Sequence, residues 1–131
     1  MTTKTALVTG AAAGIGKACA IRLAEQGYGV GVLDLNLEGC QAVVSEIEAS
    51  GGKALALQAS ITDADQVKAA ANELRSALGP ILIVVNNAGV SNFIPFEELE
   101  EKDWDFMLDV NVKGTFIVTK VCLPDMKEAR W

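Results

Sequence analysis

The 131-residue sequence contains no histidine, and this absence excludes several kinds of catalyst and metal site. Ser-His-Asp and Cys-His mechanisms both need an imidazole base, and histidine-ligated metal centres need an imidazole ligand. The three cysteines, Cys19, Cys40 and Cys122, stand too far apart for a metal-binding or redox motif. We therefore expect no bound metal, and free, buried thiols of the kind that persist in a reducing cytosol.

Positive charge and long apolar runs are also scarce. The formal net charge is -6 and the pI is about 4.6, whereas nucleic-acid-binding proteins usually carry a basic face. The longest strongly apolar run, residues 81–85, is far too short to cross a bilayer. Gly10, Gly14 and Gly16 interrupt the apolar stretches of residues 1–30, so no signal peptide is expected. These features predict a cytoplasmic protein that binds neither nucleic acid nor membrane.

The sequence does contain a regular alternation of strand and helix patterns. Half of its residues are hydrophobic, and its length suits a single globular domain over residues 1–131. Strands are expected at residues 5–9, 30–33, 54–59 and 81–85. Helices are expected from Ile15 to Gly27, from Asn36 to about Ser50, from Thr62 or Asp63 to Gly79, and from about residue 101 to 121, with Pro124 just beyond the last.

This alternation is typical of an α/β fold with right-handed crossovers and a parallel sheet. We expect a Rossmann-type, doubly wound sheet with strand order 3-2-1-4. The order of the strands reverses between the first and the fourth, and ligands bind in the crevice that such a reversal leaves at the carboxyl ends of the strands.

A glycine-rich loop joins the first strand to the first helix. It reads Thr9-Gly10-Ala11-Ala12-Ala13-Gly14-Ile15-Gly16. Glycines at this position allow a sharp turn, a close approach of the backbone to a pyrophosphate, and tight packing of helix on strand. Free N–H groups at the helix start, contributed by residues such as Ala12, Ala13 and Ile15, would face the phosphates. The alternative is an ordinary flexible turn.

An acidic residue, Asp34, ends the second strand eighteen residues after Gly16. A carboxylate at this position can accept hydrogen bonds from both hydroxyls of the adenosine ribose and would repel a 2'-phosphate. Neither Ala13 nor Leu35 is basic, so we expect NAD rather than NADP. The alternative is that Asp34 only caps the following helix, a role that Asn36 already suits.

These motifs, together with the run Asn86-Asn87-Ala88-Gly89 after the fourth strand, resemble the short-chain dehydrogenase/reductase family. The resemblance covers the whole chain and implies that the asparagine run stabilises the central sheet and lines the adenosine ribose. It implies that Ser60 and Ile61 flank the adenine, where many relatives carry Asp in place of Ser60. A serine can still hydrogen-bond the base, without the assistance of charge.

The resemblance also concerns Asn111, within the stretch LDVNVKGTF. It matches the family's catalytic asparagine, which lies where its helix is distorted and holds a water of the proton relay through its backbone. The alternative is an asparagine on a solvated helix face. An asparagine in the middle of a helix lowers helix propensity, which favours a functional reason for its presence.

The remaining catalytic residues of the family are missing. The family uses a serine, and a tyrosine followed four positions later by a lysine that lowers the pKa of the tyrosine. The only tyrosine here is Tyr28, and Val32 stands four residues after it. The chain is therefore expected to be the amino-terminal, cofactor-binding half of such an enzyme, with little or no turnover by itself.

Two functions remain open at this point. One is an NAD-dependent oxidoreductase that exchanges hydride between nicotinamide and a secondary alcohol or carbonyl compound once a complementing half is present. The other is a non-catalytic nucleotide-binding or assembly module that pairs with another chain. A third possibility is a stable folding fragment with no function of its own. We also expect a homo-oligomer through the helix at 101–121 and the strand edge at 81–85.

Overall fold

A computed structural model describes residues 4–131, so that residues 1–3 of the predicted domain lie outside the description. Its four strands are β1 (Thr5–Thr9), β2 (Gly29–Asp34), β3 (Lys53–Gln58) and β4 (Ile81–Val85). All neighbours are parallel, and their order is β3-β2-β1-β4. The predicted fold class and strand order are thus confirmed.

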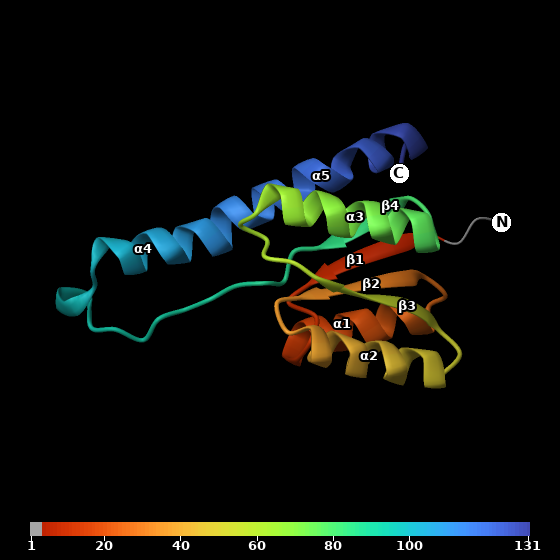
Figure 1. Cartoon of the computed structure of the whole chain (residues 1–131), viewed down its shortest axis with the longest axis horizontal. Helices are drawn as coiled ribbons and strands as arrows, with labels where there is room; N and C mark the ends of the chain where they lie inside the picture. The colour runs from red at the N-terminus through yellow and green to blue at the C-terminus, as the bar shows by residue number, and fades with distance from the viewer. Residues whose placement is uncertain (1–3) are drawn as a thin grey trace.

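Helices cover both faces of this sheet (Figure 1). On one face lie α1 (Gly14–Glu25) and α2 (Leu37–Ala49), and on the other lie α3 (Ala64–Leu78) and α5 (Gly114–Ala129). Each face has its own apolar core. One core contains Val8, Val30 and Val32 of the sheet under α1 and α2. The other contains Leu7 and Leu57 of the sheet together with Leu74 of α3. The central strands β1 and β2 are buried on both faces, which accounts for their nearly continuous apolar runs, whereas β3 and β4 are only partly buried.

Side-chain caps fix where the helices begin. The side chain of Asn36 accepts a hydrogen bond from the N–H of Gly39, 3.0 Å away, at the start of α2. The Asp63 carboxylate accepts from the N–H groups of Asp65 and Gln66 at the start of α3. Asn36 rather than Asp34 therefore caps α2, and Asp63 rather than Thr62 caps α3.

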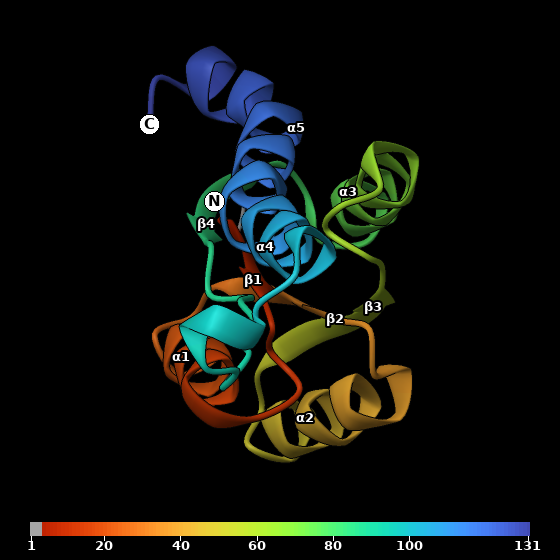
Figure 2. The ribbon, with the colours of Figure 1, turned by 90° about the vertical axis from the view of Figure 1, so that its left-hand side faces the viewer.

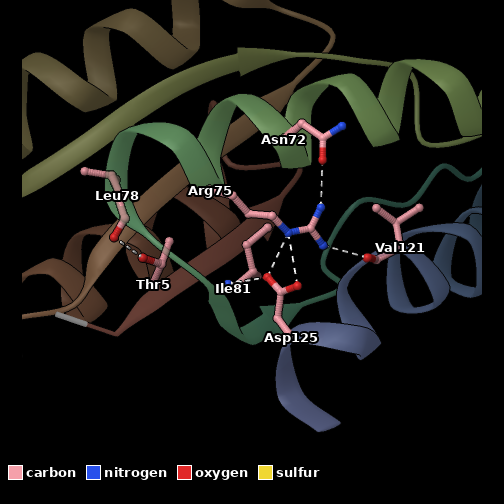
Figure 3. A network of polar contacts seen from close by, with 7 residues as sticks. All are labelled: Thr5, Asn72, Arg75, Leu78, Ile81, Val121 and Asp125. Atoms are coloured by element: carbon pink, nitrogen blue, oxygen red, sulfur yellow. Dashed lines mark hydrogen bonds and ion pairs between the residues drawn. The ribbon is translucent and has the colours of Figure 1, made fainter. Parts of the chain in front are cut away.

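The last helical region differs from the prediction. Between a 3-10 turn, η1 (Phe96–Glu98), and the end of α5, it consists of α4 (Glu101–Leu108), a π-helical segment η2 (Asp109–Lys113) and α5. The expected end near residue 121 is wrong, because α5 continues through Pro124 to Ala129. A proline inside a helix removes one backbone donor. The Arg75 guanidinium donates to the Val121 carbonyl oxygen, 2.8 Å away (Figure 3), and so ties the turn of α5 that precedes the proline to α3.

The same arginine joins α3, α5 and β4 in one polar network (Figure 3). Its Nε lies 2.8 Å from Oδ2 of Asp125 on α5, and that oxygen also accepts the N–H of Ile81 at 2.8 Å. Arg75 and Asp125 are largely buried, with side chains 27% and 14% exposed. The network holds the continuation of α5 beyond Pro124 against the sheet.

None of the helices within residues 4–131 has both the length and the apolar character needed to cross a membrane.

Candidate functional site

The glycine loop adopts backbone conformations that only glycine tolerates well. Gly10 and Gly14 have φ angles of +62° and +59°. A Cβ on Gly10 would stand 2.9 Å from the Cα of Ala88, whereas a Cβ on Gly14 would meet no atom within 4 Å. The backbone at Gly14 therefore faces open space, as a close approach to a ligand requires.

The first turn of α1 also leaves its backbone N–H groups without a side-chain cap. Its N-cap residue is Ala13, which makes no side-chain capping bond. The initial N–H groups of a helix have no partner within the helix and carry a partial positive charge. The start of α1 thus has donors suited to an anionic group such as a phosphate.

Asn87 ties this loop to the end of β4. Its side-chain nitrogen donates to the carbonyl oxygens of Thr9 and Gly10, both at 3.1 Å. The N–H groups of Asn87 and Ala88 in turn donate to the buried Thr9 hydroxyl, at 3.1 and 3.0 Å. A Cβ on Gly16 would collide with the Gly10 carbonyl and the Asn87 amide. Gly16 is thus needed for α1 to pack closely against Gly10 and the Asn87 side chain.

Asp34 is held in place by two backbone donors. Its Oδ2 accepts the N–H of Ala12 at 3.2 Å, and its Oδ1 accepts the N–H of Asn36 at 3.0 Å. These bonds connect the end of β2 to the glycine loop and fix the orientation of the carboxylate.

A cleft of about 300 Å³ opens at the carboxyl ends of the strands, where the strand order reverses. Seven predicted site residues line it: Gly10, Asp34, Leu35, Ser60, Ile61, Ala88 and Gly89. The described lining contains Asp34 as its one charged side chain and includes no lysine or arginine. The cleft is otherwise mainly apolar and can take a flat ligand with hydroxyl groups at one end.

The other predicted residues lie outside this lining. Ala12, Ala13, Gly14, Ile15 and Gly16 form the adjacent loop and the start of α1. Asn87 holds the glycine loop through its bonds to the Thr9 and Gly10 carbonyls, and Asn86 donates to the Thr119 hydroxyl on α5 at 3.1 Å. The asparagine run therefore divides into two bracing residues and two lining residues, Ala88 and Gly89.

Asn111 lies in the π-helical segment η2, which is the distortion that the family resemblance implies. Its side chain makes two bonds of 2.8 Å to Val90, accepting from the N–H and donating to the carbonyl oxygen. Asn111 is thus more than an asparagine on a solvated face, because it anchors the chain that follows Gly89. The expected role of its backbone in holding a water stays a prediction.

Six lining residues have no counterpart among the predicted site residues. Three adjoin predicted ones at the ends of β2 and β3, and the other three come from the segment after Gly89 and from the last helical region: Leu33, Ala59, Thr62, Val90, Phe106 and Val110. Nothing in the spacing of the sequence separates Phe106 from Trp104, the other aromatic residue of α4. Its place in the cleft depends on how α4 projects past the ends of the strands, to the left in Figure 1 and toward the viewer in Figure 2.

The buried thiol of Cys40 lies beneath the site. Burial, together with the negative charge of Asp34, raises the pKa of Cys40 to about 11. This cysteine is free, as are Cys19 and Cys122. Within residues 4–131 no cluster of three histidine, cysteine, aspartate or glutamate residues is arranged to hold a metal ion.

Comparison with known proteins finds one matching family and similar sequences within it. The family model described as short chain dehydrogenase matches residues 4–131. The 3-oxoacyl-(acyl-carrier-protein) reductase FabG of Staphylococcus aureus is 43% identical, with 98% of this chain and 52% of the relative aligned. D-threitol dehydrogenase of Mycolicibacterium smegmatis is 40% identical over 96% of this chain and 48% of its own.

A solved structure completes the comparison. A metagenomic short-chain oxidoreductase in complex with NADP superposes with a TM-score of 0.90 at 33% identity, covering 98% of this chain and 59% of the other. The chain thus spans about half the length of the curated relatives that it matches.

Proposed function

The chain belongs to the short-chain dehydrogenase family, and we propose that its cleft binds NAD(H) for hydride exchange with an alcohol or carbonyl compound. The observation that carries this proposal is the Asp34 carboxylate, fixed by Ala12 and Asn36 at a cleft without basic side chains. When bound, the nicotinamide would supply or accept the hydride. The exchange itself requires a complementing half that carries the tyrosine and lysine.

The residues of the chain have distinct roles in this proposal. The start of α1 and the open backbone at Gly14 receive the pyrophosphate. Asp34 accepts hydrogen bonds from the adenosine ribose, and Leu35, Ser60 and Ile61 enclose the adenine. Asn111 positions Val90 and the loop beyond Gly89.

Preference for NAD over NADP is the finer part of the proposal. A similar solved structure holds NADP, so membership of the family does not decide between the two dinucleotides. In this chain a 2'-phosphate would lie beside the Asp34 carboxylate, with no lysine or arginine in the described lining to neutralise it. Like charges in such proximity disfavour NADP.

The test is a calorimetric titration of the purified chain with NADH and, in parallel, with NADPH. We expect NADH to bind at least about tenfold more tightly, the equivalent of about 1.4 kcal/mol. The control variant Asp34→Ser removes the charge and is expected to narrow the difference between the two dinucleotides. Equal binding of NADH and NADPH by the wild-type chain would contradict the preference, and binding of neither would contradict the proposed site.

A second candidate, a nucleotide-binding or assembly module without catalysis of its own, is favoured by the position of Tyr28. This tyrosine precedes β2, whereas the cleft lies at the other end of β2, beside Asp34. It is therefore remote from any substrate at the cleft. We expect the isolated chain to show no NADH oxidation with carbonyl substrates, and turnover by a mass-verified preparation would rule out the module.

We further propose that the chain assembles as a homo-oligomer in the cytoplasm. In the described sheet β4 pairs on one side only, with β1. The helical region from α4 to α5 exposes several large apolar side chains, among them Trp104, Val112, Phe116 and Leu123. Such a combination favours association with another chain. The three free cysteines support a reducing compartment.

A further inference from the structure

One wall of the cleft comes from α4, an element to which the proposed binding of the dinucleotide assigns no role. Phe106 lines the cleft together with Val110, four residues further along the chain. The helix extends past the carboxyl ends of the strands (Figure 1), and Phe106 is 50% exposed. A half-exposed aromatic ring at the edge of a cleft offers apolar surface that a ligand can cover.

The turn after β3, at Ser60 to Thr62, has few side-chain hydrogen-bonding groups left for a nucleotide base in the same cleft. The Ser60 hydroxyl shares a hydrogen bond of 2.8 Å with the Thr62 hydroxyl. The Ser60 N–H donates to Oε1 of Gln66 at 2.9 Å, and the Ser60 carbonyl accepts the N–H of Asp63 at 3.1 Å. Each polar group of Ser60 thus already has a partner within the protein, and one hydroxyl hydrogen of the Ser60–Thr62 pair is all that these side chains have left to donate to a base.

Apolar side chains dominate the rest of the lining. Ile61, Val90, Val110 and Phe106 contribute to it alongside Leu33 and Leu35. A planar aromatic ring is the ligand part that gains most from such surroundings, because stacking on an aromatic side chain needs no particular donor or acceptor pattern.

We propose that Phe106 packs against the adenine of the dinucleotide and is a specificity-determining residue of the site. This inference rests on the proposed function and deepens it, because it assigns recognition of the base to apolar contact with α4 rather than to hydrogen bonds with Ser60. The site therefore selects for an aromatic base and tolerates changes at the base edge. The hypoxanthine analogue of NADH is bound nearly as tightly as NADH itself.

The experiment compares the wild-type chain with Phe106→Ala, Phe106→Leu and Trp104→Ala by calorimetric titration with NADH and with ADP-ribose. Trp104 is the matched control, because it lies on the same helix and is 53% exposed but does not line the cleft. Loss of a stacking contact lowers affinity about tenfold for both ligands in Phe106→Ala. Phe106→Leu keeps part of the apolar contact and loses less, and Trp104→Ala binds like the wild type.

Thermal melting first establishes that each variant is folded. A folded Phe106→Ala chain that binds NADH and ADP-ribose as tightly as the wild type overturns this inference and leaves the proposed function intact. Strong rejection of the hypoxanthine analogue by the wild type also overturns it, because it indicates hydrogen-bond readout of the base. A wild-type chain that binds neither NADH nor ADP-ribose overturns the proposed function, and this inference with it.

Discussion

At the scale of single residues, the two buried thiols show how the environment changes the chemistry of a side chain. Cys40 lies in the core between α2 and the sheet, and Cys122 lies in the core under α5. Burial is the main cause that raises the pKa of each thiol from 9.0 to about 11. Both therefore stay protonated at neutral pH and are poor nucleophiles.

These shifts predict a loss of stability at alkaline pH. Between about pH 9 and pH 11 a thiol of the unfolded chain loses its proton while the buried thiol keeps it, so the unfolded state is favoured as pH rises. Each thiol lowers the free energy of unfolding by up to about 1.4 kcal/mol per pH unit in this range. Urea unfolding at several pH values measures the slope. Cys40→Ala is expected to reduce the slope of the free energy of unfolding against pH. The control is Cys19→Ala, because Cys19 is only half-buried. Equal slopes in the two variants would contradict the account.

At the scale of secondary-structure elements, the ion pair of Arg75 and Asp125 is expected to determine how firmly α5 is attached. Removing either side chain leaves a largely buried charge and, for Asp125, the N–H of Ile81 without a partner. We expect Arg75→Ala and Asp125→Ala each to lower the free energy of unfolding by about 2 kcal/mol.

The matched control is the pair Arg22 and Glu25 on α1. These side chains lie 3.2 Å apart and are 70% and 53% exposed, so Arg22→Ala should cost less than about 0.5 kcal/mol. Chemical denaturation of the four chains gives the comparison. Similar losses for Arg75→Ala and Arg22→Ala would show that the network in Figure 3 does not hold α5.

How far the sequence predicts the fold also depends on the element. The apolar runs and caps predict all four strands and the first three helices, because each signal is local to its element. The end of α5 is mispredicted because Arg75 contacts the helix on both sides of Pro124, at the Val121 carbonyl and at Asp125. These partners lie 46 and 50 residues from Arg75 in the sequence, so no local pattern encodes the contacts. Likewise, Gly10 and Asp34 follow from local motifs, whereas Phe106 enters the cleft through the projection of α4, which no local pattern encodes.

At the scale of the whole molecule, the exposed apolar surface predicts self-association. The open edge of β4 and the exposed side chains Val112, Phe116 and Leu123 on η2 and α5 are the expected contact region. Light scattering coupled to size exclusion should give a mass at least twice the 13.8 kDa of one chain. Phe116→Glu places a charge in that region and should shift the mass toward the monomer. A wild-type chain that stays monomeric at high concentration would contradict the prediction.

The central claim is that the cleft at the carboxyl ends of the strands is the dinucleotide site. Backbone amide NMR during titration with NADH tests it most directly, because it locates the ligand residue by residue. The account predicts saturable shifts at residues 10–16, at Asp34 and Leu35, and at residues 60–61 and 88–90, all at or beside the cleft. The absence of shifts there, or shifts confined to the outer face of α5, would contradict it.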